Sequence, residues 1–320
     1  MWLEDFSPSS HPLLRREITL QLKVHSVKGQ QRGPKMLITG GVHGDEFEPM
    51  AAVRRLIKQI DPADIRGELT LVPVVNEAAF ERQHRWAEDG LDLARVCPGR
   101  RDGSVTERTA HALSQLIQSA DYYIDLHTGG TTLSVLPMSG YVLHDDPAIL
   151  EQQRGMAQAF NLPFVWGTSG KLDGRSMSVA RDAGVPAIYA EYEGAATLNP
   201  EGTDAYVEGC LNVLGHLDML EREPPPSRIE YVVEDERAGA GYMQIQNPTP
   251  IAGFFEPAVR LGQRMKAGDS MGTVSDILGD QCETVCAAHD GIVLTLKTFC
   301  RVDANDSVGV IVDVDRPLGG

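Results

Sequence analysis

Several features are scarce or missing in this sequence. No apolar run approaches the roughly 20 residues of a membrane-spanning helix, and residues 1–5 lack the basic-then-apolar pattern of a secretory signal. Basic residues are in deficit, with 29 Lys and Arg against 45 Asp and Glu, a formal net charge of -16. Nucleic acids and anionic membranes bind basic surfaces, so neither is expected as a partner. We expect a cytoplasmic protein. The net charge does not exclude a small anionic substrate, because a local arginine cluster can override the overall field.

Cysteine is also scarce. The five cysteines are Cys97, Cys210, Cys282, Cys286 and Cys300. An odd number in so long a chain disfavours a disulfide framework. The spacing of the last three is poor for a zinc knot and no fourth ligand stands out, so we interpret the cysteines as free thiols.

Short apolar segments alternate with helical periodicities through most of the chain. Strands are predicted at residues 17–25, 35–39, 68–75, 122–127 and 186–191, and helices at 47–60, 105–120, 146–160, 176–182 and 203–220. Between them, residues 29–34 form a turn cluster, residues 76–103 are irregular and 167–174 read as a loop. This alternation predicts an α/β fold with a mostly parallel or mixed sheet and helices on both faces.

The pattern changes after residues 221–226, which end in three prolines. We expect an α/β domain at residues 1–222 and a smaller all-β domain at 227–320. Residues 265–274 are echoed by 302–311, which predicts a quasi-symmetric sandwich or barrel. It resembles the fold of biotinyl and lipoyl domains, but their carrier lysine motif is absent. A structural or oligomer-forming role is therefore preferred.

His43 and Glu46 lie in a glycine-rich loop between a predicted strand and a predicted helix, where open α/β sheets bind ligands. Alone, this loop could be a turn with a solvated histidine and a helix N-terminal acid. His127 and Glu191, however, each end a strand of the same predicted sheet, so all four side chains can converge. Two histidines and one glutamate form a ligand set for catalytic zinc with one position left for water. We predict one zinc ion per chain at His43, Glu46 and His127.

Glu191 is the candidate general base, because a carboxylate near a zinc-activated water can take its proton and pass it to a leaving amine. Glu193, two residues further on, is the alternative; Glu191 is preferred because it lies at the predicted sheet edge. Asp125 precedes His127 by two residues and shares its side of the strand. It either supports His127 as a hydrogen-bond partner or satisfies a hydrogen bond in the core.

Arginines gather in the irregular segment: Arg82, Arg85, Arg95, Arg100 and Arg101. An arginine can stabilise a developing oxyanion or bind a substrate carboxylate through two parallel hydrogen bonds. The residues alone do not assign these roles.

The motifs at residues 41–46, 92–95 with 97–99, 125–129 and the strand ending at Glu191 occur in the order found in the succinylglutamate desuccinylase/aspartoacylase family. The chain resembles these zinc-dependent deacylases, which are related to zinc carboxypeptidases, over residues 35–220. It is also similar to the branch containing N-acetyl-diaminobutyrate deacetylase, through the run at residues 103–108 and a β-rich C-terminal part.

The resemblance implies zinc at His43, Glu46 and His127 with Glu191 as the base. It also implies that Arg85 polarises the scissile carbonyl and that Arg95 holds a substrate carboxylate.

Two positions depart from the family pattern. Ala94 stands where the family usually has asparagine before the arginine, which weakens a carboxylate clamp or changes how that end of the substrate is recognised. Arg175 could compensate. Glu193 stands in place of a glycine and leaves an additional acid, which could accept a cationic substrate side chain.

The sequence thus predicts a zinc-dependent amide hydrolase that removes a small acyl group from an N-acyl amino acid, with a homo-oligomer as a possible assembly. One alternative is a zinc carboxypeptidase acting on a short peptide or peptide-like amide. The other is a non-catalytic binding protein on the same fold.

Overall fold

The structure is a computed structural model that describes residues 21–237, 240–243 and 246–315. Within these residues the largest sheet has eight strands in the order β1-β3-β2-β4-β8-β6-β7-β9. Their bounds are β1 His25–Lys28, β2 Gln31–Thr39, β3 Arg66–Val72, β4 Tyr122–His127, β6 Met138–Val142, β7 Phe164–Thr168, β8 Ala187–Glu191 and β9 Tyr231–Glu234. The neighbours β3, β2, β4 and β8 are parallel, whereas β6 runs antiparallel to β8.

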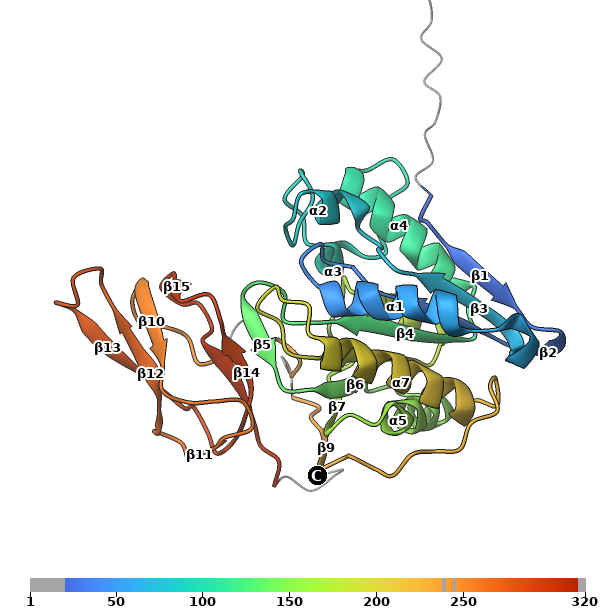
Figure 1. Cartoon of the computed structure of the whole chain (residues 1–320). Helices are drawn as coiled ribbons and strands as arrows, with labels where there is room; N and C mark the ends of the chain where they lie inside the picture. Colours follow the sequence, from blue (N-terminus) through green and yellow to red (C-terminus); the bar gives the residue numbers. More distant parts are fainter. Residues whose placement is uncertain (1–20, 238–239, 244–245, 316–320) are drawn as a thin grey trace, which may run out of the picture.

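Helices cover both faces of this sheet. They are α1 Phe47–Gln59, α2 Glu77–Glu81, α3 Leu93–Val96, α4 Val105–Gln118, α5 Pro147–Phe160, α6 Ser176–Ala183 and α7 Pro200–His216, with a 3-10 turn, η1, at Pro62–Asp64. Helices α1, α5 and α7 pack on one face (Figure 1). Helices α4 and α6 pack on the other. The mixed sheet with two helical layers confirms the predicted fold class. No helix among the described residues combines the length and apolar character needed to cross a bilayer.

Burial on both faces explains the apolar strand sequences. In β2, Met36 and Ile38 join the core under α1, α5 and α7, whereas Leu37 joins the core under α4 and α6. Strands covered on both sides read as continuous apolar runs because alternate side chains enter different cores. This packing fixes where β2 ends, and so where the loop that carries His43 begins.

Several predicted boundaries were wrong. Of the strand expected at residues 17–25, residues 17–20 lie outside the described part, and the strand begins only at His25. The turn expected at 29–34 is shorter because β2 starts at Gln31. The next strand stops at Val72, before Pro73, whose nitrogen has no hydrogen to donate. The loop expected from residue 167 starts after β7, which ends at Thr168.

The predicted bounds of the helix at residues 203–220, which corresponds to α7, were also wrong. It begins at Pro200 rather than at residue 203, because Asn199 caps it by accepting a hydrogen bond from the N–H of Glu201. It ends at His216, and Asp218 adopts a left-handed backbone at φ 54°. The irregular segment at 76–103 contains α2 and α3, which are too short to show a helical period.

The chain returns to the large sheet after the prolines, because β9 pairs in parallel with β7. The division into residues 1–222 and 227–320 stays a prediction, but β9 lies beyond the prolines and still belongs to the first sheet. The Glu234 carboxylate fixes it there. It accepts hydrogen bonds from Tyr141 Oη at 2.6 Å and from Arg154 Nε at 2.8 Å and Nη2 at 2.9 Å.

From residue 253 the described chain forms only strands, in two further sheets. These are β10 Gly253–Pro257, β11 Arg264–Met265, β12 Ser270–Ser275, β13 Cys282–Cys286, β14 Gly291–Lys297, β15 Arg301–Val302 and β16 Gly309–Val312. The sequence echo corresponds to a structural repeat, in which β10, β11 and β12 match β14, β15 and β16. The short strand of each copy pairs with the first strand of the other copy: β11 pairs with β14, and β15 pairs with β10.

The two copies share a core and a turn. Equivalent apolar residues of the two copies belong to the same core. The equivalent pairs are Phe255 and Val293, Met265 and Val302, Met271 and Val308, and Val274 and Ile311. In each turn an aspartate, Asp269 or Asp306, accepts a hydrogen bond from the backbone N–H three residues earlier. The residue before it, Gly268 or Asn305, has a left-handed backbone. Glycine and asparagine tolerate this conformation best.

A short strand, β5 (Leu133–Val135), joins this β unit to the α/β part by pairing with β14 (Figure 1). The backbone N–H of Thr298 adds a hydrogen bond of 3.0 Å to the Thr132 carbonyl. Because β5 follows His127 by only a few residues, the β unit directly supports a loop next to the predicted site.

The Glu234 contacts predict a specific loss of stability. Replacing Glu234 by alanine leaves Arg154 and the Tyr141 hydroxyl without their acceptor, so we expect the free energy of unfolding to fall by about 2–3 kcal/mol. Urea denaturation measures this change. Glu236→Ala, at an exposed position two residues on, is the matched control and should change stability by less than about 0.5 kcal/mol. Equal midpoints for the two variants would contradict the assignment.

Candidate metal centre and active site

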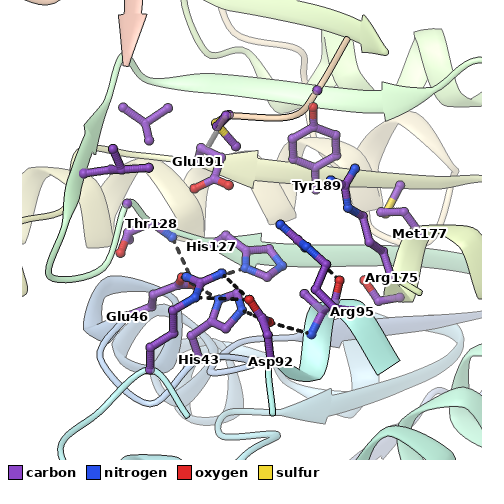
Figure 2. A pocket seen from close by; sticks show the side chains of 18 of the residues that line it. His43, Glu46, Asp92, Arg95, His127, Thr128, Arg175, Met177, Tyr189 and Glu191 are labelled. Carbon is purple, nitrogen blue, oxygen red and sulfur yellow. Dashed lines mark hydrogen bonds and ion pairs between the residues drawn. The ribbon is translucent and has the colours of Figure 1, made fainter. Parts of the chain in front are cut away.

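The carboxyl ends of the central parallel strands meet at one edge of the large sheet. His127 and Glu191 are direct neighbours there, the last residues of β4 and β8. The loop from β2 to α1 brings His43 and Glu46 to the same place. The four side chains are separated by up to 148 residues in sequence, yet they face one another (Figure 2).

Glu46 connects the two histidines. Its Oε1 lies 2.6 Å from His43 Nδ1, and its Oε2 lies 3.1 Å from His127 Nδ1 and accepts the N–H of Thr128 at 3.3 Å. His43 and Glu46 are almost fully buried. One ligand atom from each of these three residues lies within 4.8 Å of the others. Two imidazoles and one carboxylate at this spacing fit a zinc ion.

A second carboxylate stands behind each histidine. His43 Nε2 lies 3.0 Å from Asp92 Oδ1, and His127 Nε2 lies 3.0 Å from Asp125 Oδ2. When Nε2 carries the proton, each ring donates to its aspartate and keeps the Nδ1 lone pair directed at the shared cluster. This is how hydrogen-bond partners orient metal-binding histidines.

Asp125 is itself held from both sides. Thr39 Oγ1 donates to its Oδ1 at 2.8 Å, and the Ser176 hydroxyl donates to its Oδ2. Asp125 is fully buried. Burial acts to raise the pKa of Asp125, but the neighbouring His127 and these hydrogen bonds lower it below the ordinary value. The structure therefore combines both sequence readings, a partner of His127 and a satisfied buried acid.

Opposite charges in the cluster stabilise the ionised forms of their neighbours. Burial would raise the pKa of Glu46, but His43 and His127 outweigh it and hold that pKa well below the ordinary value. Burial would lower the pKa of His127, but Asp125 and Glu46 raise it well above the ordinary value. Acidic and basic side chains therefore alternate through the site. This arrangement allows a metal cation to replace a proton that they share.

Glu191 points from β8 toward His127 and Glu46 (Figure 2). It is buried, and its Oε2 has no hydrogen-bond partner among the described residues. Burial raises the pKa of Glu191 to about 7, although His127 opposes the shift. An unpartnered buried carboxylate with such a pKa is suited to accept and return a proton near neutral pH.

Arg85 contacts both Glu46 and Asp92. Its Nη1 donates to Glu46 Oε1 at 3.4 Å, and its Nε and Nη2 donate to Asp92 Oδ2 at 3.3 and 3.2 Å. Burial would lower the pKa of Arg85, but Asp92 and Glu46 raise it. The guanidinium is thus a positive charge beside the three candidate metal ligands, His43, Glu46 and His127.

Arg95 and Arg175 lie together on the far side of the site from Thr128 (Figure 2). Burial and proximity lower their pKa values, because Arg175 is close to Arg95 and Arg95 is close to Arg85. The Arg175 guanidinium lies 5.0 Å from the centre of the Tyr242 ring. Two cations placed near each other at a cavity wall favour an anionic ligand group.

The three candidate metal ligands, Glu191, Asp92 and the three arginines line a cavity of about 500 Å³, whereas Asp125 is not part of its lining. Its described lining includes Arg85, Arg95 and Arg175, but not Arg82, Arg100 or Arg101 of the irregular segment. Arg100 instead pairs with Glu107 at the start of α4.

Glu193 does not line this cavity. Its backbone is left-handed at φ 45°, and its Oε2 accepts a hydrogen bond of 2.8 Å from Asn199 Nδ2. Its N–H and carbonyl pair with Val135 and Gly129. The acid expected near the substrate is therefore turned toward the start of α7, which argues against its recognising a cationic side chain.

Sequence reasoning gave Asp92, Tyr189 and Tyr242 no role. Asp92 offered a sequence signal, because aspartate is a favoured residue at a helix N-cap. In the structure it caps α3, and its Oδ1 accepts the N–H of Ala94 at 2.9 Å. Tyr242 offered no such signal. It lies beyond the prolines in a stretch without periodicity, and only the return of the chain through β9 brings it to the cavity.

Comparison with known proteins agrees with this architecture. The chain is 30% identical over 296 residues to the N-alpha-acetyl-L-2,4-diaminobutyric acid deacetylase of Halomonas elongata, covering 90% of this chain and 84% of that protein. A crystal structure of a succinylglutamate desuccinylase/aspartoacylase from Rhodobacter sphaeroides has a TM-score of 0.83 and 27% identity, covering 91% of this chain and 89% of the other.

The product-bound structure of the ectoine utilization protein EutE (DoeB) from Ruegeria pomeroyi has a TM-score of 0.82 and 26% identity, covering 90% of this chain and 87% of the other. The protein-family model of the succinylglutamate desuccinylase/aspartoacylase catalytic domain matches residues 32–217 of this chain. These residues include every predicted metal ligand and the buried Glu191. The chain is therefore a member of the succinylglutamate desuccinylase/aspartoacylase family.

Proposed function

We propose that the protein is a zinc-dependent amide hydrolase that removes a small acyl group from an N-acyl amino acid. The observation that carries the proposal is the cluster of His43, Glu46 and His127 with the buried carboxylate of Glu191 facing it, whose Oε2 has no hydrogen-bond partner within the described parts of the chain. Membership of the family, and a relative named as a deacetylase, support amide hydrolysis as the reaction.

His43, Glu46 and His127 would hold the zinc ion through Nδ1, a carboxylate oxygen and Nδ1. When bound, zinc supplies Lewis acidity that polarises a carbonyl and lowers the pKa of a water molecule. Asp92 and Asp125 keep the two imidazoles in the tautomer that leaves Nδ1 free.

Glu191 carries the proton. Its buried carboxylate accepts a proton from the attacking water and later donates it to the departing amine. Arg85 faces the same space with a permanent positive charge and stabilises the oxygen anion that develops on the attacked carbonyl. Both groups are held by the fold before substrate binds, so little reorganisation accompanies the reaction.

The cavity gives the substrate a direction. Arg95 and Arg175 offer the amino acid carboxylate two guanidinium groups, and Arg175 supplies a contact that Ala94 cannot make. Thr128 lies on the opposite side of the site from these arginines (Figure 2), and the described lining between residues 128 and 135 is uncharged: Thr128, Gly129, Thr132, Leu133 and Val135. This side suits a small neutral acyl group.

Hydrolysis assays on the zinc-loaded protein test the function. An N-acetyl amino acid should be cleaved at least about tenfold better, in kcat/KM, than a dipeptide with the same C-terminal residue. Preference for the dipeptide would favour a carboxypeptidase. Stoichiometric zinc without turnover of a broad panel of acyl amino acids would favour a binding protein.

Zinc affinity should depend on the aspartates behind the histidines. We expect His43→Ala to abolish stoichiometric zinc binding. Asp92→Asn should weaken it by about 10–100-fold, because a neutral amide is a weaker acceptor for the imidazole N–H than the carboxylate that it replaces. Competition with a chelating dye measures both. Asp173→Asn, which changes an exposed carboxylate paired with Arg181, should bind zinc like the wild type. Unchanged affinity in Asp92→Asn would remove that residue from the site.

Glu191 should determine the acidic side of the pH profile. Glu191→Gln should retain zinc but lower kcat by about 10²–10⁴-fold, because an amide cannot accept the proton. In the wild type, kcat/KM should fall as pH decreases through the pKa of Glu191, since only the carboxylate is active. Burial raises this pKa to about 7 in the metal-free cluster, and a bound cation moves the limb to lower pH.

A pH–rate profile of the zinc-loaded enzyme measures this limb. Full activity of Glu191→Gln, or an acidic limb that is the same in that variant, would exclude Glu191 as the base.

A further inference from the structure

Two backbone segments that carry the cavity arginines meet at Gly174. The N–H of Cys97, two residues after Arg95, donates a hydrogen bond of 3.0 Å to the carbonyl of Gly174, the residue before Arg175. Gly174 has a left-handed backbone at φ 82°. The contact therefore joins the end of α3 to the start of α6, far apart in sequence.

The approach at this junction leaves no room for a side chain. A Cβ on Gly174 would lie 2.5 Å from the carbonyl oxygen of Arg95, 2.8 Å from its carbonyl carbon and 3.1 Å from its Cα. All three are backbone atoms, so no rotamer change relieves the overlap. Any residue other than glycine must push the Arg95 backbone away from the Arg175 backbone.

Each side of the junction is otherwise firmly held. On the α3 side, Asp92 accepts the N–H of Ala94 and contacts His43, so the position of Arg95 is tied to a metal ligand. On the α6 side, Ser178 Oγ accepts the N–H of Arg175 at 3.0 Å and donates to the Arg175 carbonyl at 2.7 Å. The spacing of the two guanidiniums is thus set where the segments touch.

We propose that Gly174 is a positioning residue for substrate binding: its backbone contact with Arg95 sets the separation of Arg95 and Arg175. Gly174 itself makes no contact with substrate. The proposal rests on the proposed function in taking the amino acid carboxylate as the group that the two arginines bind. It predicts that widening the junction weakens recognition of that carboxylate while the chemistry at the metal cluster continues.

Steady-state kinetics of zinc-loaded Gly174→Ala test the proposal. We expect KM for an N-acetyl amino acid to rise about 10–100-fold with kcat changed less than about threefold, because a displacement near 1 Å misplaces a binding group but not the base. Product inhibition adds an independent readout. The inhibition constant of the free amino acid should rise by the same factor, and that of acetate should stay constant.

Gly67→Ala is the matched control. Gly67 also has a positive φ, 88°, and a Cβ there would lie 2.0 Å from the Pro34 carbonyl oxygen. It lies near the start of β3, at the edge of the sheet opposite to the site. This variant should lose thermal stability with KM unchanged. A similar KM increase in both variants, or a loss of kcat alone in Gly174→Ala, would overturn the proposal.

Ser178→Ala provides a milder second variant if Gly174→Ala does not fold. It removes the two hydrogen bonds between the Ser178 hydroxyl and the Arg175 backbone and adds no atoms. KM and the amino acid inhibition constant should therefore rise together by about threefold or more. An unchanged KM would contradict the proposal. If the wild type cleaves no N-acyl amino acid, the proposed function fails, and calorimetric binding of the free amino acid still tests Gly174.

Discussion

The carboxylate of Glu46 is buried between two imidazoles and a guanidinium, and each partner comes from a different part of the chain. A buried charge is costly unless it is paired and hydrogen-bonded. The loop after β2, the end of β4 and the segment after α2 must therefore converge for the charge to be tolerated. The same arrangement leaves three ligand atoms together, so the condition for burying Glu46 is also the condition for forming a metal site.

The parallel strands bring these distant residues together without any special local structure. Neighbouring parallel strands end at the same edge, and the register pairs His127 with Glu191 and Asp125 with Tyr189. Two residues on the same side of β4 then have separate roles: His127 lines the cavity, whereas Asp125 stays buried and contacts the His127 ring. The proposed base, Glu191, and the proposed ligand, His127, are thereby placed on neighbouring strands of the sheet, which suits a preorganised site.

The walls of the cavity come from elements that the strand edge does not supply. One wall follows His127 and is supported by the pairing of β5 with β14, which gives the C-terminal β unit a direct structural role at the site. The opposite wall combines Arg95, Arg175 and Tyr242 from α3, the start of α6 and the chain beyond β9. The candidate metal ligands and the two cavity walls therefore come from different elements of the fold.

The sequence by itself determined the α/β class, the strand ends that carry His127 and Glu191, and the glycine-rich loop with His43 and Glu46. Local patterns report these features because periodicity and strand termination depend on neighbouring residues. Only the tertiary structure decided that Asp92 supports His43, that Glu193 turns away from the cavity and that Tyr242 reaches it. These outcomes depend on long-range packing and on single left-handed backbone positions such as Glu193, and no periodic signal encodes either.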